Sequence, residues 1–384
     1  MVMRMNKSQD VLKELEKYRN KDYSFASGKI LGSMCTQPHP IAKKAYINFL
    51  ETNLGDPDLF SGSREIESKY ISFISNLLNA PKTAGSVIVS GGNESNITAI
   101  WIAKNLSRKK EVLFPSSAHF SFDKLASMMD VKLVPISLTK DYKMDVSDFK
   151  KKISKNTLAV VGVAGSTELG TIDPIPELSD ICRDEHIFLH VDAAFGGYVI
   201  PFLNNLGYNV PNFDFKLKGV SSISIDAHKM GWSAIPLGTL FIRNKSWFEK
   251  ISVESHCVSS KTQSGILGTR SGGPVAAAYA VAKYLGKDGY KNMVKQCMDN
   301  TIYLDKKLTK IGLNLVVKPT INVIGVKLKN PEKVAKQLSK HGWKVNIMDR
   351  ISSIRIVVMP HVTRKVLDDF IPVLKKVCKN LGEI

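Results

Sequence analysis

The stretch SIDAHKMG, residues 224–231, places a lysine directly after a strand-like run. The apolar alternation of residues 222–225 ends at Asp226, and His228 and Lys229 follow almost at once. Burial at such a position is expected to depress the pKa of a lysine, because a low dielectric disfavours the ammonium form. A lysine of this kind can serve as an amine nucleophile. Its role depends on which groups the neighbouring segments place beside it.

Residues 60–285 alternate between short apolar runs and amphipathic segments. The apolar runs lack polar alternation, which is typical of strands that are buried on both faces. The predicted strands are SVIVS (86–90), EVLFP (111–115), KLVPI (132–136), LAVVGVAG (158–165), IFLHVDA (187–193), SSISIDA (221–227) and TLFIRN (239–244). Helical periodicity predicts helices at 94–106, 120–129, 146–154 and 175–185. We therefore expect an α/β fold with a mainly parallel, seven-stranded sheet wrapped by helices.

The pattern changes after Gly289. Beyond it we expect a helix at 291–310, strands at 313–317 and 322–328, a helix at 331–341, strands at 343–348 and 354–358, and a helix at 363–381. This predicts a large domain at 50–288 and a small C-terminal α+β domain at 289–384. The N-terminal segment, 1–49, is expected to open with a short amphipathic helix that is capped near Asn6 or Ser8, and not with a signal peptide.

Composition excludes several classes of protein. With 384 residues, 43% of them hydrophobic and 23% charged, the chain is typical of a globular protein. No apolar run approaches the ~20 residues that cross a bilayer, so we expect a cytoplasmic protein without a membrane partner. Five cysteines without a C-x-x-C pair make a disulfide framework or a metal site an unfavoured interpretation. The net charge of +19 comes mostly from lysines scattered over polar faces, which does not favour a nucleic-acid partner.

Two other predicted strand ends carry suggestive segments. In VIVSGGNESNIT (87–98), glycines between a strand and a helix can expose N–H groups at the positive helix end, as a phosphate or carboxylate requires. The segment is neither a P-loop nor a dinucleotide fingerprint, and a turn without a ligand explains it equally well. In HVDAAFGG (190–197), Asp192 follows an apolar run, and a buried carboxylate needs a partner. The small residues behind it leave room for a planar ligand.

One ligand accounts for these three segments. Asp192 and Lys229 are separated by one strand–connection–strand step, so their side chains are expected at the same sheet edge, where α/β proteins bind ligands. Pyridoxal 5'-phosphate requires a phosphate cradle, a carboxylate that faces its ring nitrogen, and a lysine that forms a Schiff base. The sequence therefore predicts pyridoxal phosphate as the cofactor.

The same motifs resemble the group II pyridoxal-phosphate decarboxylases of fold type I, which include the glutamate and aromatic amino-acid decarboxylases. The resemblance covers residues 30–360 and rests on SGGNESN (90–96), AHF (118–120), HVDAAFGG, DAHKMG (226–231) and GTRSGG (268–273). It is strongest to the archaeal decarboxylases of L-tyrosine and L-aspartate. It implies a carboxy-lyase that makes tyramine for methanofuran or β-alanine for coenzyme A.

The resemblance also implies roles for individual residues around the cofactor. Lys229 would form the Schiff base, Asp192 would face the ring nitrogen, and His119 and Ala194 would lie against opposite faces of the ring. The phosphate contacts would be Ser90, Gly91, Gly92, Asn93 and His228, and Thr167 would lie near the 3-hydroxyl group. Thr269 would reach the phosphate from a neighbouring subunit, which implies a homodimer with shared active sites.

The resemblance places the amino-acid substrate near Thr36, Asn53 and Arg355. A guanidinium can bind a carboxylate with two hydrogen bonds, although a surface arginine on a strand explains Arg355 almost as well. Many relatives carry a tyrosine on a mobile loop that protonates the carbon from which CO₂ leaves. Here His256 and Cys257 stand in that loop, and we expect one of them to donate the proton.

Three alternatives stay open at this point. A carbon–carbon lyase of the sphingosine-phosphate-lyase type would need a membrane anchor and further basic residues for a second phosphate. A sulfur-transferring enzyme would need a reactive cysteine, such as Cys257. A tRNA-dependent pyridoxal enzyme or an RNA-binding protein, suggested by the net charge, would bind RNA in a salt-sensitive manner.

Overall fold

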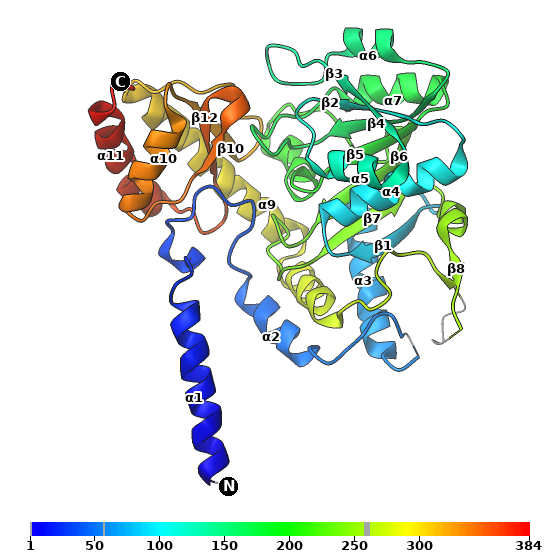
Figure 1. The fold of residues 1–384 in the computed structure, drawn as a ribbon, viewed down its shortest axis with the longest axis horizontal. Helices are drawn as coiled ribbons and strands as arrows, with labels where there is room; N and C mark the ends of the chain where they lie inside the picture. Colours follow the sequence, from blue (N-terminus) through cyan, green and yellow to red (C-terminus); the bar gives the residue numbers. More distant parts are fainter. Residues whose placement is uncertain (1, 57, 257–261) are drawn as a thin grey trace.

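A seven-stranded sheet forms the centre of the molecule (Figure 1), in a computed structural model that describes residues 2–56, 58–256 and 262–384. The strands are β1 (Gly85–Val89), β2 (Glu111–Pro115), β3 (Lys132–Ile136), β4 (Thr157–Val163), β5 (Phe188–Asp192), β6 (Val220–Asp226) and β7 (Gly238–Ile242). Their order is β1-β7-β6-β5-β4-β2-β3, and only the pairings of β7 are antiparallel. All seven predicted strands and the mainly parallel sheet are confirmed.

Helices cover both faces of this sheet. On one face, α4 (Gly92–Leu106) and α5 (Ser121–Met129) bury residues such as Ile100 and Phe122. On the other face, α3 (Ser61–Leu77), α7 (Ile175–Asp184) and α9 (Gly272–Lys310) contribute to a second apolar cluster. The short α6 (Val146–Lys152) packs beside β3. The four helices predicted between the strands are present, because their apolar residues recur at the helical period and face the sheet.

The C-terminal part is a smaller α+β unit. Its antiparallel sheet has the order β10-β12-β11, with β10 (Val323–Lys327), β11 (Asn346–Met348) and β12 (Ser353–Val357). The helices α10 (Pro331–Lys340) and α11 (Arg364–Asn380) pack against each other beside it. The predicted α+β character is confirmed, whereas the boundaries at 49/50 and 288/289 stay a proposal. The predicted helix at 291–310 belongs to the longer α9, which changes direction at Gly286 (φ 59°, ψ −169°).

The strand predicted at 313–317 is wrong. This segment forms only an isolated bridge between Leu315 and Val326, although Val316 N–H donates to the carbonyl of Gly325 at 2.9 Å. Pro319 follows closely, and proline has no N–H to continue a ladder, which limits the pairing to this short contact.

The N-terminal residues leave the body of the molecule and return to it. Helix α1 (Val2–Arg19) extends away from the rest (Figure 1) and begins before the cap expected near Asn6 or Ser8. The following chain joins the small sheet, where Leu31 N–H donates to the carbonyl of Lys344 at 2.7 Å. Helix α2 (Pro40–Asn48) then packs on α9. None of the described helices is both long enough and apolar enough to cross a membrane.

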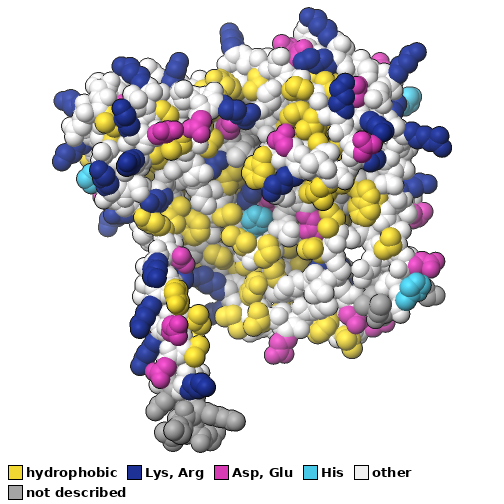
Figure 2. Space-filling model, viewed as in Figure 1, with side chains coloured by type: hydrophobic (Ala, Val, Ile, Leu, Met, Phe, Trp, Pro, Cys, Tyr) yellow, Lys and Arg dark blue, Asp and Glu magenta, His cyan; other side chains and the backbone are white. Residues whose placement is uncertain are grey.

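The shorter elements connect this framework. They are η1 (Phe25–Ser27), η2 (Gly196–Tyr198), α8 (Ile200–Leu203), η3 (Asn204–Leu206), η4 (Lys245–Ile251), β8 (Val253–Glu254), β9 (Thr262–Gln263) and η5 (Asp349–Ile351). Figure 2 shows lysine and arginine side chains scattered over the surface, while apolar side chains gather around a hollow near the centre of this face.

Candidate active site

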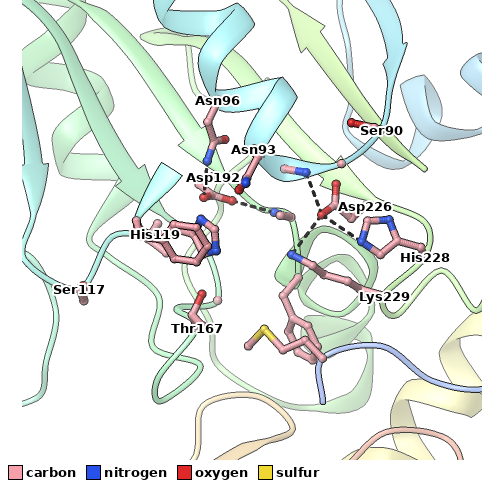
Figure 3. A pocket seen from close by; sticks show the side chains of 18 residues that line it. Ser90, Asn93, Asn96, Ser117, His119, Thr167, Asp192, Asp226, His228 and Lys229 are labelled. Atoms are coloured by element: carbon pink, nitrogen blue, oxygen red, sulfur yellow. Dashed lines mark hydrogen bonds and ion pairs between the residues drawn. The ribbon is translucent and has the colours of Figure 1, made fainter. Parts of the chain in front are cut away.

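A cavity of about 380 Å³ opens at the carboxyl ends of β4, β5 and β6, beside the N-terminus of α4 (Figure 3). This is the edge where a parallel sheet is expected to bind a ligand. Among the predicted residues, the cavity wall contains Ser90, Gly91, Gly92, Asn93, His119, Thr167, Asp192, Ala194, His228 and Lys229. The fold therefore brings together residues from five separate segments of the chain.

Lys229 lies in an ion pair that the sequence analysis did not anticipate. Its Nζ is 3.0 Å from Oδ2 of Asp226, the last residue of β6 and only 1% exposed. Burial by itself would lower the pKa of Lys229, but the carboxylates of Asp226 and Asp192 outweigh burial and raise it. The expected depressed pKa is therefore wrong, because these two acids stabilise the ammonium form.

Asp192 ends β5 and is held by three hydrogen bonds. Its Oδ2 accepts from Nδ2 of Asn96 at 2.9 Å, and its Oδ1 accepts from the N–H of Ala194 at 3.1 Å and from Oγ of Ser224 at 3.3 Å. Burial works against the charged carboxylate, yet Lys229, Asn96 and the N–H of Ala194 lower the pKa of Asp192. The cavity therefore contains a fixed, ionised carboxylate.

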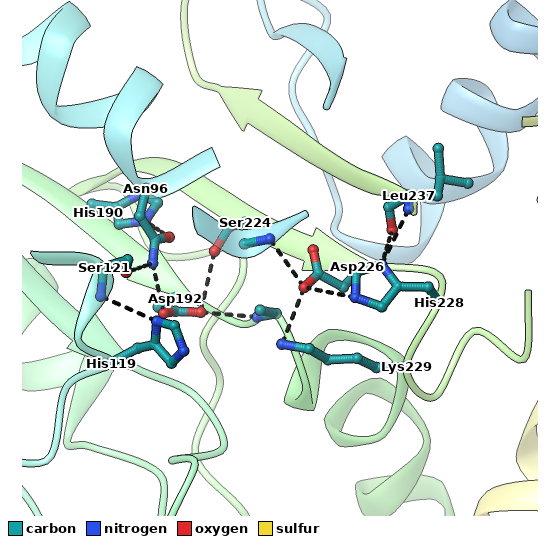
Figure 4. A network of polar contacts seen from close by, with 12 residues as sticks. Asn96, His119, Ser121, His190, Asp192, Ser224, Asp226, His228, Lys229 and Leu237 are labelled. Carbon is teal, nitrogen blue, oxygen red and sulfur yellow. Dashed lines mark hydrogen bonds and ion pairs between the residues drawn. The ribbon is translucent and has the colours of Figure 1, made fainter. Parts of the chain in front are cut away.

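Behind Asp192, a buried histidine fixes the orientation of Asn96 (Figure 4). Because Asn96 Nδ2 donates to Asp192 and to Ser121 Oγ, its Oδ1 must accept from Nε2 of His190, at 2.9 Å. Nδ1 of His190 then accepts from Oγ of Ser222 at 2.8 Å. Burial lowers the pKa of His190 to about 4, so the ring is neutral at neutral pH.

His119 stands at the mouth of the cavity, on the loop between β2 and α5. Its Nδ1 accepts from the N–H of Ser121 at 3.2 Å, and the centre of its ring is 4.0 Å from that of Phe120. Burial lowers the pKa of His119. A neutral, oriented imidazole suits contact with the face of an aromatic ligand.

The glycine-rich turn before α4 is only partly available as an anion cradle. The N–H and Oγ of Ser90 both donate to Oε2 of Glu94 at 2.7 Å, and the N–H of Gly92 donates to Oδ2 of Asp226 at 3.1 Å. Two of the turn's backbone donors are therefore occupied by the chain's own carboxylates. Gly91, with φ of 152°, has a backbone that residues with a Cβ rarely adopt.

The other predicted site residues do not line this cavity. Oγ1 of Thr36 forms a hydrogen bond with Nδ1 of His361 at 2.8 Å. The guanidinium of Arg355 donates hydrogen bonds to the carbonyls of Thr167 and Gly32 at 2.7 and 2.6 Å. Arg355 is buried, with its Nε unpartnered, so the interpretation as a surface arginine is wrong.

Asn53, His256 and Thr269 do not line this cavity either. Asn53 forms an isolated antiparallel β-bridge with Ser271, and its Oδ1 accepts a hydrogen bond from the N–H of Arg270 at 3.2 Å. Arg270 directly follows Thr269 in the chain. His256 is exposed, and Cys257 lies outside the described residues. Their predicted roles are not tested by the fold of one chain.

Asp226 and Asn96 are the important residues that the sequence analysis missed. The sequence pattern marks Asp226 only as the end of a strand, although a turn that brings position i beside i+3 would place it against Lys229. Asn96 lies one helical turn beyond Gly92, on the face of α4 that looks into the sheet. The helical period alone could have indicated that Asn96 points toward the predicted carboxylate.

The chemistry of this donor set fits pyridoxal phosphate. An amine and an ionised carboxylate line one cavity, a neutral histidine stands at its mouth, and the N-terminus of a fifteen-residue helix supplies further N–H groups. Asp192 keeps an anionic oxygen toward the cavity, as a protonated ring nitrogen requires. Ala194 and the glycines leave the space that a flat ring needs.

Comparisons with known proteins agree with this chemistry. The family described as the pyridoxal-dependent decarboxylase conserved domain matches residues 62–329. The chain is 46% identical to a probable L-tyrosine/L-aspartate decarboxylase of Methanothermobacter thermautotrophicus, over 88% of this chain and 94% of the relative. It is 46% identical to an L-aspartate decarboxylase of Thermococcus kodakarensis (97% and 98% covered), and 47% identical to an L-aspartate/L-glutamate decarboxylase of Pyrococcus horikoshii (96% of each).

Solved structures share the fold. A sphingosine-1-phosphate lyase of Burkholderia pseudomallei has a TM-score of 0.89 at 24% identity, with 98% of this chain and 90% of that chain covered. A glutamate decarboxylase of Lactobacillus brevis has a TM-score of 0.87 at 22% identity, with 97% and 92% covered. The expected fold type I architecture is thereby confirmed. With this fold, this arrangement of Lys229 and Asp192 and these relatives, the chain belongs to the pyridoxal-dependent decarboxylase family and is a carboxy-lyase that works with pyridoxal phosphate.

Proposed function

We propose that the chain releases the α-carboxylate of L-aspartate to give β-alanine, of L-tyrosine to give tyramine, or of both. The observation that carries the decarboxylase chemistry is that Lys229 and Asp192 line one cavity. The choice of amino acids is supported by the names of the relatives, among which L-aspartate recurs. The products would serve coenzyme A and methanofuran synthesis, respectively.

When bound, pyridoxal phosphate supplies an electron sink for the carbon from which CO₂ departs. We expect Asp192 to hold a proton on the ring nitrogen, because its carboxylate is ionised and fixed by Asn96, Ala194 and Ser224. His119 and Phe120 line the cavity, and we expect them to limit the access of water to a bound cofactor. Lys229 would hold the cofactor through its amine.

Arg355 is our candidate for substrate binding. Its guanidinium is only 4% exposed, forms none of the ion pairs found among the described residues, and retains an unpartnered Nε. It also holds the backbone of Thr167, which lines the cavity. A small rotation would let it bind a carboxylate in place of one carbonyl, which favours an acidic amino acid. Met34, Phe120 and Phe195 in the cavity wall favour an aromatic side chain instead.

The proton donor and the assembly remain part of the proposal. We expect His256 or Cys257 to protonate the carbon that loses CO₂. We also expect a homodimer in which Thr269 reaches the phosphate of the partner's cofactor, since Thr269 does not line the cavity of its own chain. A cytoplasmic location and the absence of a nucleic-acid partner stay predictions.

A panel of L-amino acids, assayed for CO₂ release with added pyridoxal phosphate, tests the function. We expect release from L-aspartate or L-tyrosine by the wild-type chain and none by Lys229→Ala. Cleavage of a phosphorylated amino alcohol without CO₂ release would replace the proposal with the lyase alternative. Size-exclusion chromatography with light scattering tests the dimer.

A further inference from the structure

Asp226 occupies a position that its place at the end of a strand does not explain. Its Oδ2 contacts Nζ of Lys229 at 3.0 Å, accepts from the N–H of Gly92 at 3.1 Å, and lies 3.7 Å from Nε2 of His228. Its Oδ1 is buried and has no hydrogen-bond partner. A buried carboxylate with an unpaired oxygen is costly, so a purely structural aspartate is a poor explanation.

Glycines make room for this carboxylate. A Cβ on Gly238 would lie 2.5 Å from Asp226 Oδ1, and a Cβ on Gly92 would lie 3.3 Å from its Oδ2. A Cβ on Gly91 would come within 3.1 Å of the ring of His228. The glycines that the sequence assigns to a phosphate therefore also admit Asp226 beside Lys229. Three glycines around one acid indicate that its position, and not merely its charge, is important.

The surroundings leave Asp226 as the single acceptor in contact with the ammonium. The titratable groups that face the pair from other elements are Asp192, His119, Cys35, His228, Tyr70 and Tyr198. Burial raises the pKa of the Cys35 thiol and of both tyrosines, and lowers that of His119, so these groups are neutral near pH 7. Asp192 is charged but makes no hydrogen bond with Lys229 in the part of the chain that the structure describes.

We propose that Asp226 is a catalytic proton acceptor for Lys229, and that it removes a proton from the ammonium each time this lysine captures the aldehyde of pyridoxal phosphate. This rests on the proposed role of Lys229. A lysine must lose a proton before its nitrogen can attack a carbonyl carbon. Transfer to a carboxylate 3.0 Å away makes the amine available without releasing the proton to solvent.

The protons balance within the pair. Lys229 begins with three protons on Nζ, and Asp226 begins ionised. One proton moves to Asp226, Nζ attacks the aldehyde carbon, and the carbonyl oxygen becomes a hydroxyl with a second proton from nitrogen. Asp226 then returns its proton to that hydroxyl, which leaves as water while the carbon–nitrogen double bond forms. One proton remains on nitrogen, Asp226 is ionised again, and no other reagent is needed.

This relay predicts a distinctive pH dependence. Because the pair shares the same transferable proton in both arrangements, capture that proceeds through the relay does not depend on the pKa of Lys229, and the pyridoxal phosphate contributes its remaining pH dependence. In Asp226→Asn, the proton must leave to solvent, so capture slows by about tenfold for each pH unit below the pKa of Lys229. Asp214→Asn is the matched control, because Asp214 is also a buried aspartate but lines a different cavity.

The test is stopped-flow absorbance of pyridoxal phosphate mixed with the full chain after its cofactor has been stripped, between about pH 5 and pH 8. We expect the capture rate of Asp226→Asn, divided by that of Asp214→Asn, to fall steadily as the pH is lowered. A ratio that does not change with pH overturns the proposal. Circular dichroism checks that both variants are folded.

A second measurement keeps the proposal testable if Asp226→Asn does not fold. The wild-type rate is compared with capture by butylamine, a free amine that must lose its proton to water. We expect the protein-to-butylamine ratio to rise about tenfold for each pH unit of acidification, and a constant ratio refutes the relay. Because no amino acid is present, a failure here is distinct from a failure of decarboxylation, and Lys229→Ala shows whether capture uses this lysine at all.

Discussion

Replacing Asn96 with leucine should be unusually damaging for a single buried amide. The leucine side chain has a similar size, but it removes the donor to Asp192 and the acceptor for His190. A lost hydrogen bond to a charged group costs about 1.5–3 kcal/mol, and the orphaned N–H of His190 costs about 1–3 kcal/mol more. We therefore expect Asn96→Leu to lower the free energy of unfolding by about 2.5–6 kcal/mol.

Asn300 offers the matched control. It is also a buried asparagine, and its Nδ2 donates to one neutral backbone carbonyl, that of Val362, at 3.1 Å. Asn300→Leu should cost only about 1 kcal/mol. Urea unfolding of both variants measures the two costs, and the equilibrium dissociation of pyridoxal phosphate measures the effect on the site. If Asn96→Leu costs no more than Asn300→Leu and retains the cofactor equally well, the proposed support of Asp192 is wrong.

Three further outcomes are expected. Lys229→Ala should remove the visible absorbance of the bound cofactor and all turnover. Because Asp226 loses its ion-pair partner, the same variant should lower the free energy of unfolding in urea by about 3–5 kcal/mol. Unchanged stability would contradict the buried pair. His190 has a folded-state pKa of about 4 against 6.5 in the unfolded chain, so its contribution to stability is complete above pH 6.5 and is lost as the pH falls toward 4. Wild type should therefore lose about 3 kcal/mol more than His190→Gln over this range in urea titrations, and parallel curves would count against a neutral buried ring. Arg355→Met should raise the KM for the amino acid at least tenfold. Arg350→Ala, which removes an ion pair between a largely exposed arginine and Glu168, is the control and should leave KM unchanged; equal effects of both variants on KM would argue against substrate binding by Arg355.

The sequence predicted the sheet well because its central strands, β4, β5, β6 and β7, are buried along their whole length. The apolar run 158–163 has no polar alternation, so its pattern has one structural interpretation. The segment 313–317 has a similar composition, but its pairing depends on a partner strand and on the following Pro319. Such tertiary conditions are not encoded within a short window.

The candidate site was predictable where residues follow strands directly. Asp192 and Lys229 were found because polar residues at the ends of apolar runs are conspicuous, and the fold type guarantees that these ends meet. Asp226 was missed because its importance arises from a turn that folds it back onto Lys229. The sign of the Lys229 pKa shift was missed for the same reason, since burial was counted and the paired acid was not.

The reversed direction of β7 has a consequence for how this protein tolerates change in length. Because Asp226 at the end of β6 pairs with Gly238 at the start of β7, the chain from 227 to 237 stays at the catalytic edge and is clamped at both ends. The crossovers between parallel strands pass over to the far edge, so an added residue there can be absorbed at a distance. An insertion between 227 and 237 cannot be accommodated in this way. We therefore expect natural variants and engineered libraries alike to conserve the length of this connection even where its sequence changes.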